Sequence, residues 1–391
     1  MGLLTHVGRP LEGATVCMLV TNDVLRDARV RKEARSVAEA GADVTVIGVG
    51  AQLDSALLDE PYRVRLIEPM RSSTHRFWLR RVICNLIAVR QFERRMEVAA
   101  VAQGAHVYHA NDLDTLRQAM RAAHRVGARL VYDAHELSTE SGTMKWWERL
   151  IGRRRERCGI RRADAVMCVN YGIARELRDR YRVPLPAVVY NGGAERVTEP
   201  HAPSVPVRLL FQGQFFADRG LDAIIGAVAA RGGDAILTLQ GWGGVESELR
   251  ALVTELKAED VVRFVAPCGP LEVIAAAAEH DVGIINHDPL SLNHLLASPN
   301  KLFDYICAGL AVVAPDYPVF REILDDAGCG VFSRSSSIAD VVAAVDSLVR
   351  DPTRIATLKR AAVEASHRYT WAVQAEVLVD LYSAVLDLRR K

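Results

Sequence analysis

Long hydrophobic runs are absent from this sequence of 391 residues. Its longest apolar stretches fall far short of the roughly 18 residues that suggest a membrane-spanning helix, so no spanning helix is expected. The N-terminal stretch MGLLTHVGRPLEGATV lacks the charged-then-apolar pattern of a secretory signal. Gly2 is not followed by the Ser or Thr of a myristoylation motif. We therefore expect neither a secretory signal nor a myristoyl anchor.

Cysteine is sparse, odd in number and scattered. No two of the seven cysteines have C-x-x-C spacing, and most lie within apolar segments: Cys17, Cys84, Cys158, Cys168, Cys268, Cys307 and Cys329. This pattern argues against a zinc site or a disulfide framework and favours buried, reduced thiols. A reducing cytoplasm is therefore the expected location.

Neither sign of charge dominates, because the formal net charge is only +1. The charge is nevertheless uneven. Residues 1–195 carry 31 Lys and Arg against 23 Asp and Glu, whereas residues 196–391 carry 18 against 25. This split suggests that the two halves meet different partners and that the first half meets an anionic one. We expect no nucleic-acid partner.

A repeating pattern of strands and helices fills the chain. Between the strand-like runs lie stretches of helical length and period, such as VRKEARSVAEAG, in which Ala34, Val37 and Ala38 share a face and Gly41 ends the helix. The apolar, β-prone runs are ATVCMLVTN, ADVTVIGVG, YRVRLIEP, AHVYHAND, ARLVYDAHEL, DAVMCVN, AVVYNGG, VRLLFQGQ, AILTLQG, VVRFVAP, VGIINH, AVVAPD and CGVFSR. Strands with continuous apolar character predict parallel sheets covered on both faces. The expected fold class is α/β, with two Rossmann-like, doubly wound domains.

The boundary between the two domains is expected in NGGAERVTEPHAPSVP, which has three prolines, few apolar residues and no periodicity. We predict a first domain over residues 1–195 and a second over residues 196–370. The tail from Pro352 has no strand-like run and fits two helices that divide near His367–Tyr369. Its last segment, 371–391, is expected to be a helix that packs back toward the first domain.

Two segments of the second half could hold an anion. Ligands of open parallel sheets bind beyond the carboxyl ends of the strands, and the cleft between two such domains is the expected site. One strand-like run leads into GQFFADRG, Gly213 to Gly220, just before a helix. Glycines admit a ligand close to the backbone, and Arg219 could neutralise a phosphate there. An ordinary turn with a solvated arginine remains the alternative.

The stretch SPNKLFDYICAGLAVVA offers the second anion site. Pro299 and Asn300 begin a helix whose free N–H groups can hold a phosphate, and Lys301 could add positive charge. Asp304, one turn further on, could accept hydrogen bonds from two vicinal hydroxyls, as on a ribose. The alternative is that Asp304 complements the helix dipole and Lys301 is solvated. Two such helix starts in one sheet favour a nucleoside diphosphate.

Several segments, in this order and spacing, resemble retaining glycosyltransferases of family 4, which have the GT-B fold with two Rossmann-like domains facing a cleft. The resemblance covers nearly the whole chain. Its segments are NDVLRDARVRKEARSVAEAGADVTVIG, HANDLDTLRQA, RLVYDAHELSTE, ADAVMCVNYGIARELRDRY, VVYNGG, FQGQFFADRGLDAIIGAV, SPNKLFDYICAGLAVVA and YTWAVQAEVLVDLY. It implies a nucleotide-sugar donor held mainly by the second domain and an acceptor held mainly by the first.

The resemblance also assigns roles on the donor side, where this chain departs from the family at two places. In the family pattern G-R-x-x-x-x-K-G, Gln214 stands in the place of the Arg and Arg219 in that of the Lys. The family pattern E-x7-E ends on a ribose-binding carboxylate, here Asp304, and its first Glu would fall at Leu296. Nearby polar residues could substitute for that Glu or be solvated: Asn286, His287, Asp288 and His294.

In the first half, the resemblance places His135, which follows the strand LVYDA, near the transferred sugar. The simpler alternative is a strand-end histidine satisfied by Glu136 or by the backbone. Asp112 and Asp114 could orient an acceptor hydroxyl, or could cap the following helix. The expected acceptor-side residues are Asn22, Asp27, Arg31, Asp112 and Asp114. The glycine pair that many relatives have after the first strand is missing, so no phosphate nest is expected there.

Two basic stretches mix arginine with large apolar residues: RSSTHRFWLRRVICNLIAVRQFERRME, which runs from Arg71 to Glu97, and KWWERLIGRRRERCGIRR. Such segments can lie on an anionic membrane, here the inner face of the cell membrane. The alternative is that each stretch is a core helix with a solvated arginine face.

The implied reaction moves a sugar from a nucleotide-diphosphate donor to a hydroxyl acceptor with retention of the anomeric configuration. A UDP-sugar is the favoured donor, and a GDP-sugar is the alternative. His135, Arg219 and Lys301 are the expected catalytic residues, and the donor-binding residues are Gly213, Gln214, Arg219, Pro299, Asn300, Lys301 and Asp304. No D-x-D-like pair is placed for a metal, so we expect neither metal nor cofactor. A nucleotide-sugar epimerase and a non-catalytic nucleotide-sugar-binding protein remain alternatives, whereas the absence of G-x-G-x-x-G disfavours a dehydrogenase.

Overall fold

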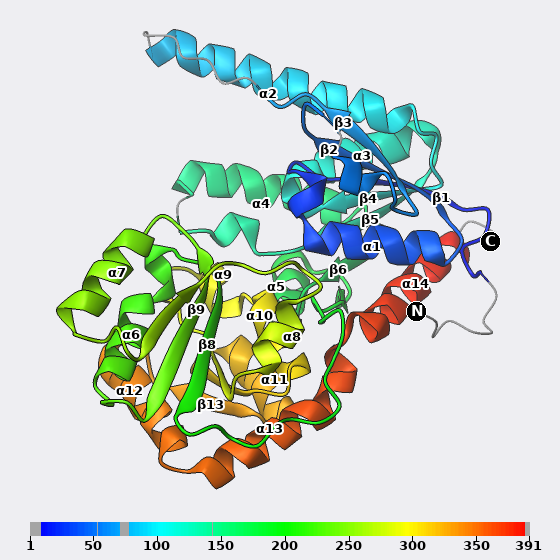
Figure 1. Ribbon diagram of the computed structural model, residues 1–391. Coiled ribbons are helices and arrows are strands. Elements are labelled where there is room, and N and C mark those ends of the chain that lie inside the picture. Colours follow the sequence, from blue (N-terminus) through cyan, green and yellow to red (C-terminus); the bar gives the residue numbers. More distant parts are fainter. Residues whose placement is uncertain (1–8, 53, 71–77, 143, 388–391) are drawn as a thin grey trace. The chain divides into compact units, whose positions relative to one another are not determined.

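The computed structural model describes residues 9–52, 54–70, 78–142 and 144–387 of the chain. It divides into two compact units (Figure 1). Unit 1 comprises the chain up to Val189 and again from Ala375, and unit 2 comprises Tyr190–Gln374. The boundaries predicted from sequence lay at 195/196 and 370/371, a few residues from these divisions.

Unit 1 is built on a seven-stranded sheet in which every pairing is parallel. The strand order is β3-β2-β1-β4-β5-β6-β7. The strands are β1 (Thr15–Leu19), β2 (Asp43–Val49), β3 (Arg63–Ile67), β4 (Val107–Asn111), β5 (Arg129–Ala134), β6 (Ala165–Cys168) and β7 (Ala187–Val188). The order reverses direction between β1 and β4, and ligands of such sheets bind where the order reverses.

Helices flank this sheet (Figure 1). They are α1 (Ala28–Glu39), α2 (Trp78–Val101), α3 (Asp112–Val126), α4 (Trp146–Ile160), α5 (Tyr171–Tyr181) and α14 (Trp371–Asp387), with short 3-10 turns η1 (Val24–Arg26), η2 (Ser55–Leu57) and η3 (Ser138–Glu140). Helix α3 packs against both α2 and α4. None of the helices in the described ranges combines the length and apolar character needed to cross a membrane.

Unit 2 repeats the same plan with a six-stranded parallel sheet of order β10-β9-β8-β11-β12-β13. Its strands are β8 (Val207–Gln214), β9 (Ala235–Trp242), β10 (Val262–Val265), β11 (Val282–Ile284), β12 (Ala311–Pro315) and β13 (Gly330–Ser333). Its helices are α6 (Leu221–Ala229), α7 (Glu246–Glu255), α8 (Val273–Ala278), α9 (Leu292–Leu296), α10 (Asn300–Cys307), α11 (Pro318–Ala327), α12 (Ile338–Val349) and α13 (Pro352–Ser366), with turns η4 (Ala217–Arg219) and η5 (His367–Tyr369).

Both faces of each sheet are covered, as the continuous apolar strands predicted. All thirteen strand-like runs form strands, and the residues of β4 and β12 are buried throughout. In β8, Leu209 and Phe211 join one apolar core and Leu210 joins the other, because successive side chains point to opposite faces. The doubly wound α/β architecture is therefore confirmed.

The tail of the chain forms two helices, divided by the turn His367–Tyr369 as predicted. Gly193 pairs with Thr370 in an isolated parallel bridge, which ties the start of unit 2 to the end of α13 and η5. The division between the units falls within α14. In unit 1 the buried Tyr382 of this helix lies 2.6 Å from Nδ1 of His109 on β4.

Candidate active site

The end of β8 and the start of α10 meet in unit 2. Gly213, near the end of β8, has φ of +125°, a backbone conformation that favours glycine. A Cβ at this position would lie only 3.3 Å from Nζ of Lys301, the second residue of α10. The structure thus brings together two residues that the sequence placed about 90 positions apart, and glycine is what leaves room for the lysine.

Lys301 is half-buried, and its Nζ lies 3.5 Å from the centre of the Phe211 ring. This is a cation–π contact. Within the described residues, no carboxylate lies within ion-pair distance of its Nζ. Burial, with a further contribution from the charge of Arg219, lowers the pKa of Lys301 to about 7. An anion bound here would therefore meet a cation that is poorly compensated by the protein.

Arg219 ends the 3-10 turn that follows β8, and its side chain is 36% exposed. Its one ion pair among the described residues is a long contact of 3.8 Å with the neighbouring Asp218. The next residue, Gly220, has φ of +56° and lies against Asn286 so closely that a Cβ would approach Nδ2 to 2.4 Å. Arg219 is thus held on a tight turn with its guanidinium largely available.

The N-terminus of α10 lies beside these cations. Pro299 is its N-cap and contributes no side-chain hydrogen bond, and Asn300 is exposed at the first helical position. The first N–H groups of a helix lack intrahelical partners and attract anions. Asp304 is half-buried one turn later. Six predicted donor-side residues therefore gather here: Gly213, Arg219, Pro299, Asn300, Lys301 and Asp304. Gln214 ends β8 and is exposed.

The residues suggested as substitutes for the missing carboxylate have structural partners. Leu296 is buried at the end of α9. Asn286 donates to the carbonyls of Gly220 and Ser336, and the ring of His287 contacts the carbonyl of His294. Asp288 accepts a hydrogen bond from the Ser336 hydroxyl at 2.6 Å, and its carbonyl lies 3.0 Å from Nδ1 of His294. These contacts stabilise the loop between β11 and α9. Asn286 and His287 are buried and not solvated, whereas Asp288 and His294 are half-buried.

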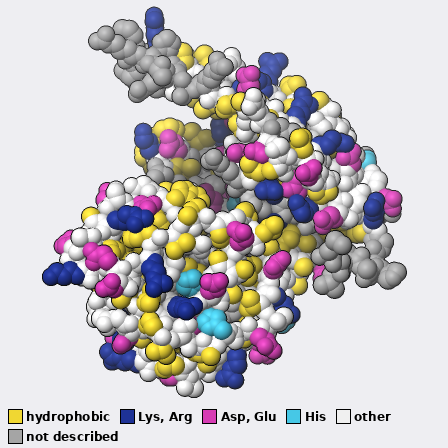
Figure 2. Space-filling view, viewed as in Figure 1, with side chains coloured by type: hydrophobic (Ala, Val, Ile, Leu, Met, Phe, Trp, Pro, Cys, Tyr) yellow, Lys and Arg dark blue, Asp and Glu magenta, His cyan; other side chains and the backbone are white. Residues whose placement is uncertain are grey.

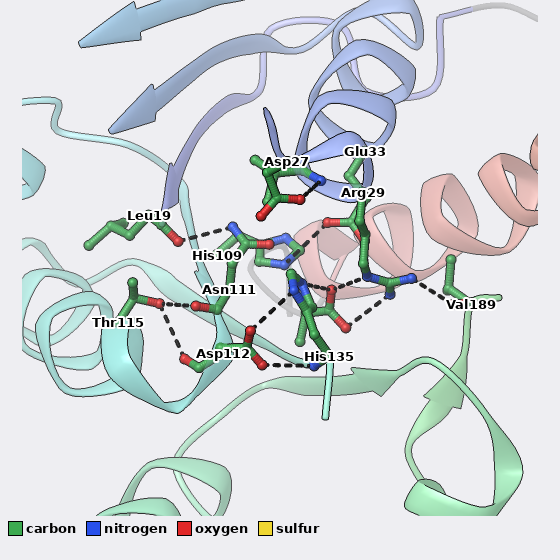
Figure 3. Close-up of polar contacts among 12 residues, drawn as sticks. Leu19, Asp27, Arg29, Glu33, His109, Asn111, Asp112, Thr115, His135 and Val189 are labelled. Carbon is green, nitrogen blue, oxygen red and sulfur yellow. Dashed lines mark hydrogen bonds and ion pairs between the residues drawn. The ribbon is translucent and has the colours of Figure 1, made fainter. Parts of the chain in front are cut away.

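In unit 1, Asp112 and His135 join the ends of neighbouring strands β4 and β5 (Figure 3). One carboxylate oxygen of Asp112 accepts the backbone N–H of His135 at 2.9 Å, and the other lies 3.2 Å from Nδ1 of its ring. Asp112 has φ of +62°, which is rare for a residue other than glycine. Thr115 donates its hydroxyl to the carbonyls of Asn111 and Asp112, which supports this conformation.

The second ring nitrogen of His135 faces Asp133, with Nε2 2.8 Å from a carboxylate oxygen. Burial alone would lower the pKa of His135, but Asp112 and Asp133 outweigh burial and raise it well above its usual value. His135 is therefore a charged imidazolium between two carboxylates. Neither Glu136 nor the backbone alone satisfies it, contrary to the simpler expectation, and Asp112 does not act as the cap of α3.

Arg29 on α1 completes this arrangement. Its guanidinium contacts both oxygens of Asp133, at 2.8 and 3.0 Å, and donates to the carbonyl of Val189 at 2.8 Å. Asp133 is fully buried, and although burial raises its pKa, Arg29 and His135 hold it well below the usual range. One turn along α1, Glu33 also lies 2.9 Å from Nε of Arg29.

Glu33 and His109 are fully buried behind this cluster. Burial raises the pKa of Glu33 well above its usual value and lowers that of His109 to about 4. Glu33, His109 and Asp133 present possible metal-ligand atoms within 4.8 Å of one another. The Arg29 guanidinium already contacts both carboxylates, however, so a metal ion would have to displace a buried cation.

The other predicted acceptor-side residues have different surroundings. The amide of Asn22 donates to Asp27 at 2.8 Å, and Asp27 also caps α1 by accepting the N–H of Val30. Arg31 turns instead toward Glu60, at 2.7 Å, and is engaged in that ion pair. Asp114 is exposed on the first turn of α3, two residues after Asp112.

Sequence reasoning missed the buried part of this cluster: Arg29, Glu33, His109, Asp133 and Tyr382. The spacing of Arg29 and Glu33, four residues apart on one helix, was a signal for an ion pair. Asp133 was visible as an acidic residue inside an apolar strand, which needs a cation when buried. Nothing local in the sequence linked Tyr382 to His109, because 273 positions separate them.

Two family models match this chain in tandem. The model described as "Glycosyl transferase 4-like domain" matches residues 27–192, and the model described as "Glycosyl transferases group 1" matches residues 198–366. A curated relative, D-inositol 3-phosphate glycosyltransferase of Corynebacterium aurimucosum, is 25% identical over an alignment of 219 residues that covers 51% of this chain. The match spans 49% of that relative, so about half of its length is covered.

Solved structures share the fold over almost the whole chain. Sucrose-phosphate synthase from Thermosynechococcus elongatus matches with a TM-score of 0.72 at 14% identity and covers 96% of this chain and 100% of that chain. The Anabaena protein HepE in complex with UDP matches with a TM-score of 0.72 at 15% identity, over 95% of this chain and 100% of that chain. Matched by both tandem models and sharing this two-sheet architecture, the chain belongs to glycosyltransferase family 4 and has the GT-B fold.

Proposed function

We propose that the protein is a retaining glycosyltransferase that uses a nucleotide-diphosphate sugar and a hydroxyl acceptor. The observation that carries the proposal is the convergence of Lys301 and Arg219 at Gly213, beside the N-terminus of α10. The acceptor is a small molecule, a glycan or a lipid-linked hydroxyl in cell-envelope or natural-product biosynthesis. The protein acts in the cytoplasm, with peripheral contact to the inner face of the membrane.

The electrostatics of unit 2 suit a leaving diphosphate. Breaking the bond to the sugar places negative charge on the diphosphate oxygens, and donors fixed in advance stabilise that charge most effectively. Lys301 is half-buried and without a carboxylate partner in the described part of the chain, and Arg219 adds a second cation. The N–H groups at the start of α10 add partial positive charge. Asp304 would accept hydrogen bonds from the ribose hydroxyls.

The paired state of His135 limits its role in the reaction. Both ring nitrogens lie within 3.2 Å of a carboxylate, and the raised pKa keeps the ring charged. A charged imidazole cannot accept a proton, so His135 acts as a fixed cation toward the substrate and not as a base. Transfer on the same face of the sugar suits this arrangement, since the departing diphosphate can take the proton of the acceptor hydroxyl.

A UDP-sugar is the favoured donor and a GDP-sugar the alternative. HepE structures in complex with UDP and with UDP-glucose share this fold at 15% identity, which is consistent with the first choice. We further propose that transfer needs no metal, because the two cations of unit 2 take the place that a bound metal would have beside the diphosphate. A non-catalytic nucleotide-sugar-binding protein is the second candidate, favoured by Leu296 and Gln214 at the places of a family carboxylate and a family cation. A nucleotide-sugar epimerase of the same fold is the other alternative.

A donor panel tests this proposal. The protein is incubated with UDP- and GDP-sugars, with and without candidate acceptors and with a chelator, and nucleoside diphosphate release is followed by NMR. We expect slow release from at least one donor, faster release with an acceptor, unchanged release with the chelator, and a product with the donor's anomeric configuration. Formation of the donor's epimer without an acceptor would favour the epimerase, and binding of a donor without any turnover would favour the non-catalytic protein.

A further inference from the structure

One stripe of large apolar side chains lies on the surface of α4 in unit 1. Trp146, Trp147, Leu150 and Ile151 are all exposed, and 77% of the Trp146 surface is accessible. They recur four residues apart, so they form a continuous band along the first two turns of the helix. Single exposed apolar residues are common, whereas contiguous patches mark surfaces that bind a partner or a membrane.

A second apolar stripe lies on α2. Ile83, Leu86 and Ile87 are exposed at a spacing of three and four residues, again on one helical face. This is the segment that the sequence marked as basic and amphipathic from Arg71 onward. Residues 71–77 of that segment, and the side chains of Trp78 and Leu79, lie outside the described part of the structure.

Helices α2 and α4 border a common surface, because both pack against α3 and residues of both line one hollow. A hollow of about 460 Å³ is lined by Leu86 and Arg90 of α2, Arg117 of α3 and Arg155 of α4. In Figure 1 both helices begin on the same side of unit 1, and Figure 2 shows hydrophobic and basic side chains next to one another over them. We call the exposed residues of α2 from Ile83 to Arg95 and of α4 from Trp146 to Arg157 the α2–α4 face.

The exposed charge of the α2–α4 face is basic, although Arg153 is paired with Glu140 and Arg95 lies 3.7 Å from Glu68. Among its described residues, every exposed charged side chain is an arginine. On α2 these are Arg90, Arg94 and Arg95, and on α4 they are Arg153, Arg154, Arg155 and Arg157. The three acidic residues of the same segments are less exposed than these arginines. Glu93 is bonded to Arg117, Glu148 is half-buried and accepts the backbone N–H of Lys145, and Glu156 is buried against Tyr132 and Tyr181.

We propose that the α2–α4 face docks unit 1 onto an anionic lipid bilayer. Tryptophan, leucine and isoleucine would enter the headgroup boundary, and the surrounding arginines would meet lipid phosphates. Arginine suits this position because its stem lies along apolar surface while its guanidinium binds phosphate. The docking deepens the proposed function by favouring a lipid-linked acceptor, and only that consequence rests on glycosyl transfer.

Vesicle co-sedimentation of the full-length protein tests the docking without any donor or acceptor. The two probes are vesicles of phosphatidylcholine alone and vesicles of phosphatidylcholine mixed with phosphatidylglycerol. We expect binding to the anionic vesicles that weakens as salt is added, a blue shift of tryptophan fluorescence, and weak binding to the neutral ones. The double variant Trp146→Ser with Trp147→Ser should bind anionic vesicles at least about tenfold more weakly.

The matched control is Leu58→Ser, which removes another exposed leucine of unit 1 (68% exposed) outside the two helices and should bind as the natural protein does. Circular dichroism and donor affinity check that each variant is folded. If the tryptophan variant misfolds, Leu86→Ser with Ile87→Ser on α2 replaces it. Absence of binding to anionic vesicles, equal binding by the tryptophan and control variants, or a dimer in solution that the tryptophan variant abolishes would each overturn the proposal.

Discussion

The carboxylate of Asp112 holds both the backbone N–H and the ring Nδ1 of His135, at 2.9 and 3.2 Å. From the sequence, Asp112 was a candidate to contact the acceptor or to cap a helix. In the structure, Asp112 positions His135. It keeps a left-handed backbone to do so. Such a conformation has a cost of order 1–3 kcal/mol and persists only where the surroundings enforce it, often at functional sites.

Asp112→Asn should lower the pKa of His135, because it removes one of two carboxylates that stabilise the imidazolium. NMR titration of the His135 ring measures this directly. Activity near neutral pH should fall with the loss of ring charge. Asp114→Asn, an exposed neighbour two residues away, serves as the control and should leave the His135 titration unchanged. An unaltered titration in Asp112→Asn would contradict the assigned pairing.

The same pairing has a consequence for stability. The pKa of His135 in the folded protein lies above its unfolded value of 6.5, so the stabilisation is fully present below about pH 6.5. It is lost as the pH rises through the folded pKa. The difference in unfolding free energy between the natural protein and Asp112→Asn should therefore be largest in mildly acid solution and should shrink in alkaline solution, as measured by urea unfolding.

Tyr382→Phe should destabilise unit 1 by about 1–3 kcal/mol, because it leaves the fully buried Nδ1 of His109 without its partner. Urea unfolding followed by circular dichroism gives the change. Ser383→Ala, which removes a hydroxyl that donates to the Val379 carbonyl within the same helix, is the control and should change stability little. Equal stabilities of the two variants would argue against the contact between α14 and β4.

Donor affinity should fall as the pH rises through about 7, because Lys301 then loses its charge. A nucleotide sugar is the suitable ligand, since its diphosphate keeps a constant charge over this range. Titration calorimetry from pH 6 to 8 should show weakening affinity and proton uptake on binding. Lys301→Arg keeps the charge at all these pH values and should flatten the profile. A flat profile in the natural protein would remove Lys301 from the diphosphate site.

Asp304→Asn should weaken donor binding roughly tenfold to a hundredfold, the range for losing a hydrogen bond to a charged group. Measuring a 2′-deoxyribose donor with both the natural protein and the variant makes the test specific for the ribose contact. The deoxy donor should bind less well than the ribose donor to the natural protein, and the two should bind alike to the variant. Full retention of donor affinity in Asp304→Asn, or an unchanged preference for ribose, would refute the ribose contact.

Structural features that depend on a short stretch of sequence were predicted, whereas contacts between distant residues were not. All thirteen strands followed from continuous apolar runs, and the start of α10 followed from Pro299 in SPNKLFDY. Gly213 and Lys301 were each identified by their own segments. Their proximity, so close that a Cβ on Gly213 would lie 3.3 Å from Nζ of Lys301, and the contact of Lys301 with Phe211 depend on the packing of β8 against α10.

The buried cluster around Asp133 was predicted only in part, because its residues come from distant parts of the sequence. His135 was expected near the transferred sugar, with local satisfaction as the alternative. Its partners are Asp112 at the start of α3 and Asp133 of β5, and Asp133 is held in turn by Arg29 of α1. A sequence contains the ionisable residues without stating which of them will be buried together. Once they are buried, each charge needs an opposite one, so the pairing of Asp133 with two cations follows from the fold and not from the local pattern.

Arg219→Ala tests whether Arg219 and Lys301 hold the donor diphosphate. Nucleoside diphosphate binding and donor turnover are measured for the natural protein, for this variant and for Arg250→Ala, an exposed arginine of α7 paired with Glu246. We expect Arg219→Ala to weaken diphosphate binding by roughly tenfold or more and to reduce turnover, and Arg250→Ala to leave both unchanged. Unchanged affinity of Arg219→Ala for both donor and diphosphate would contradict this assignment.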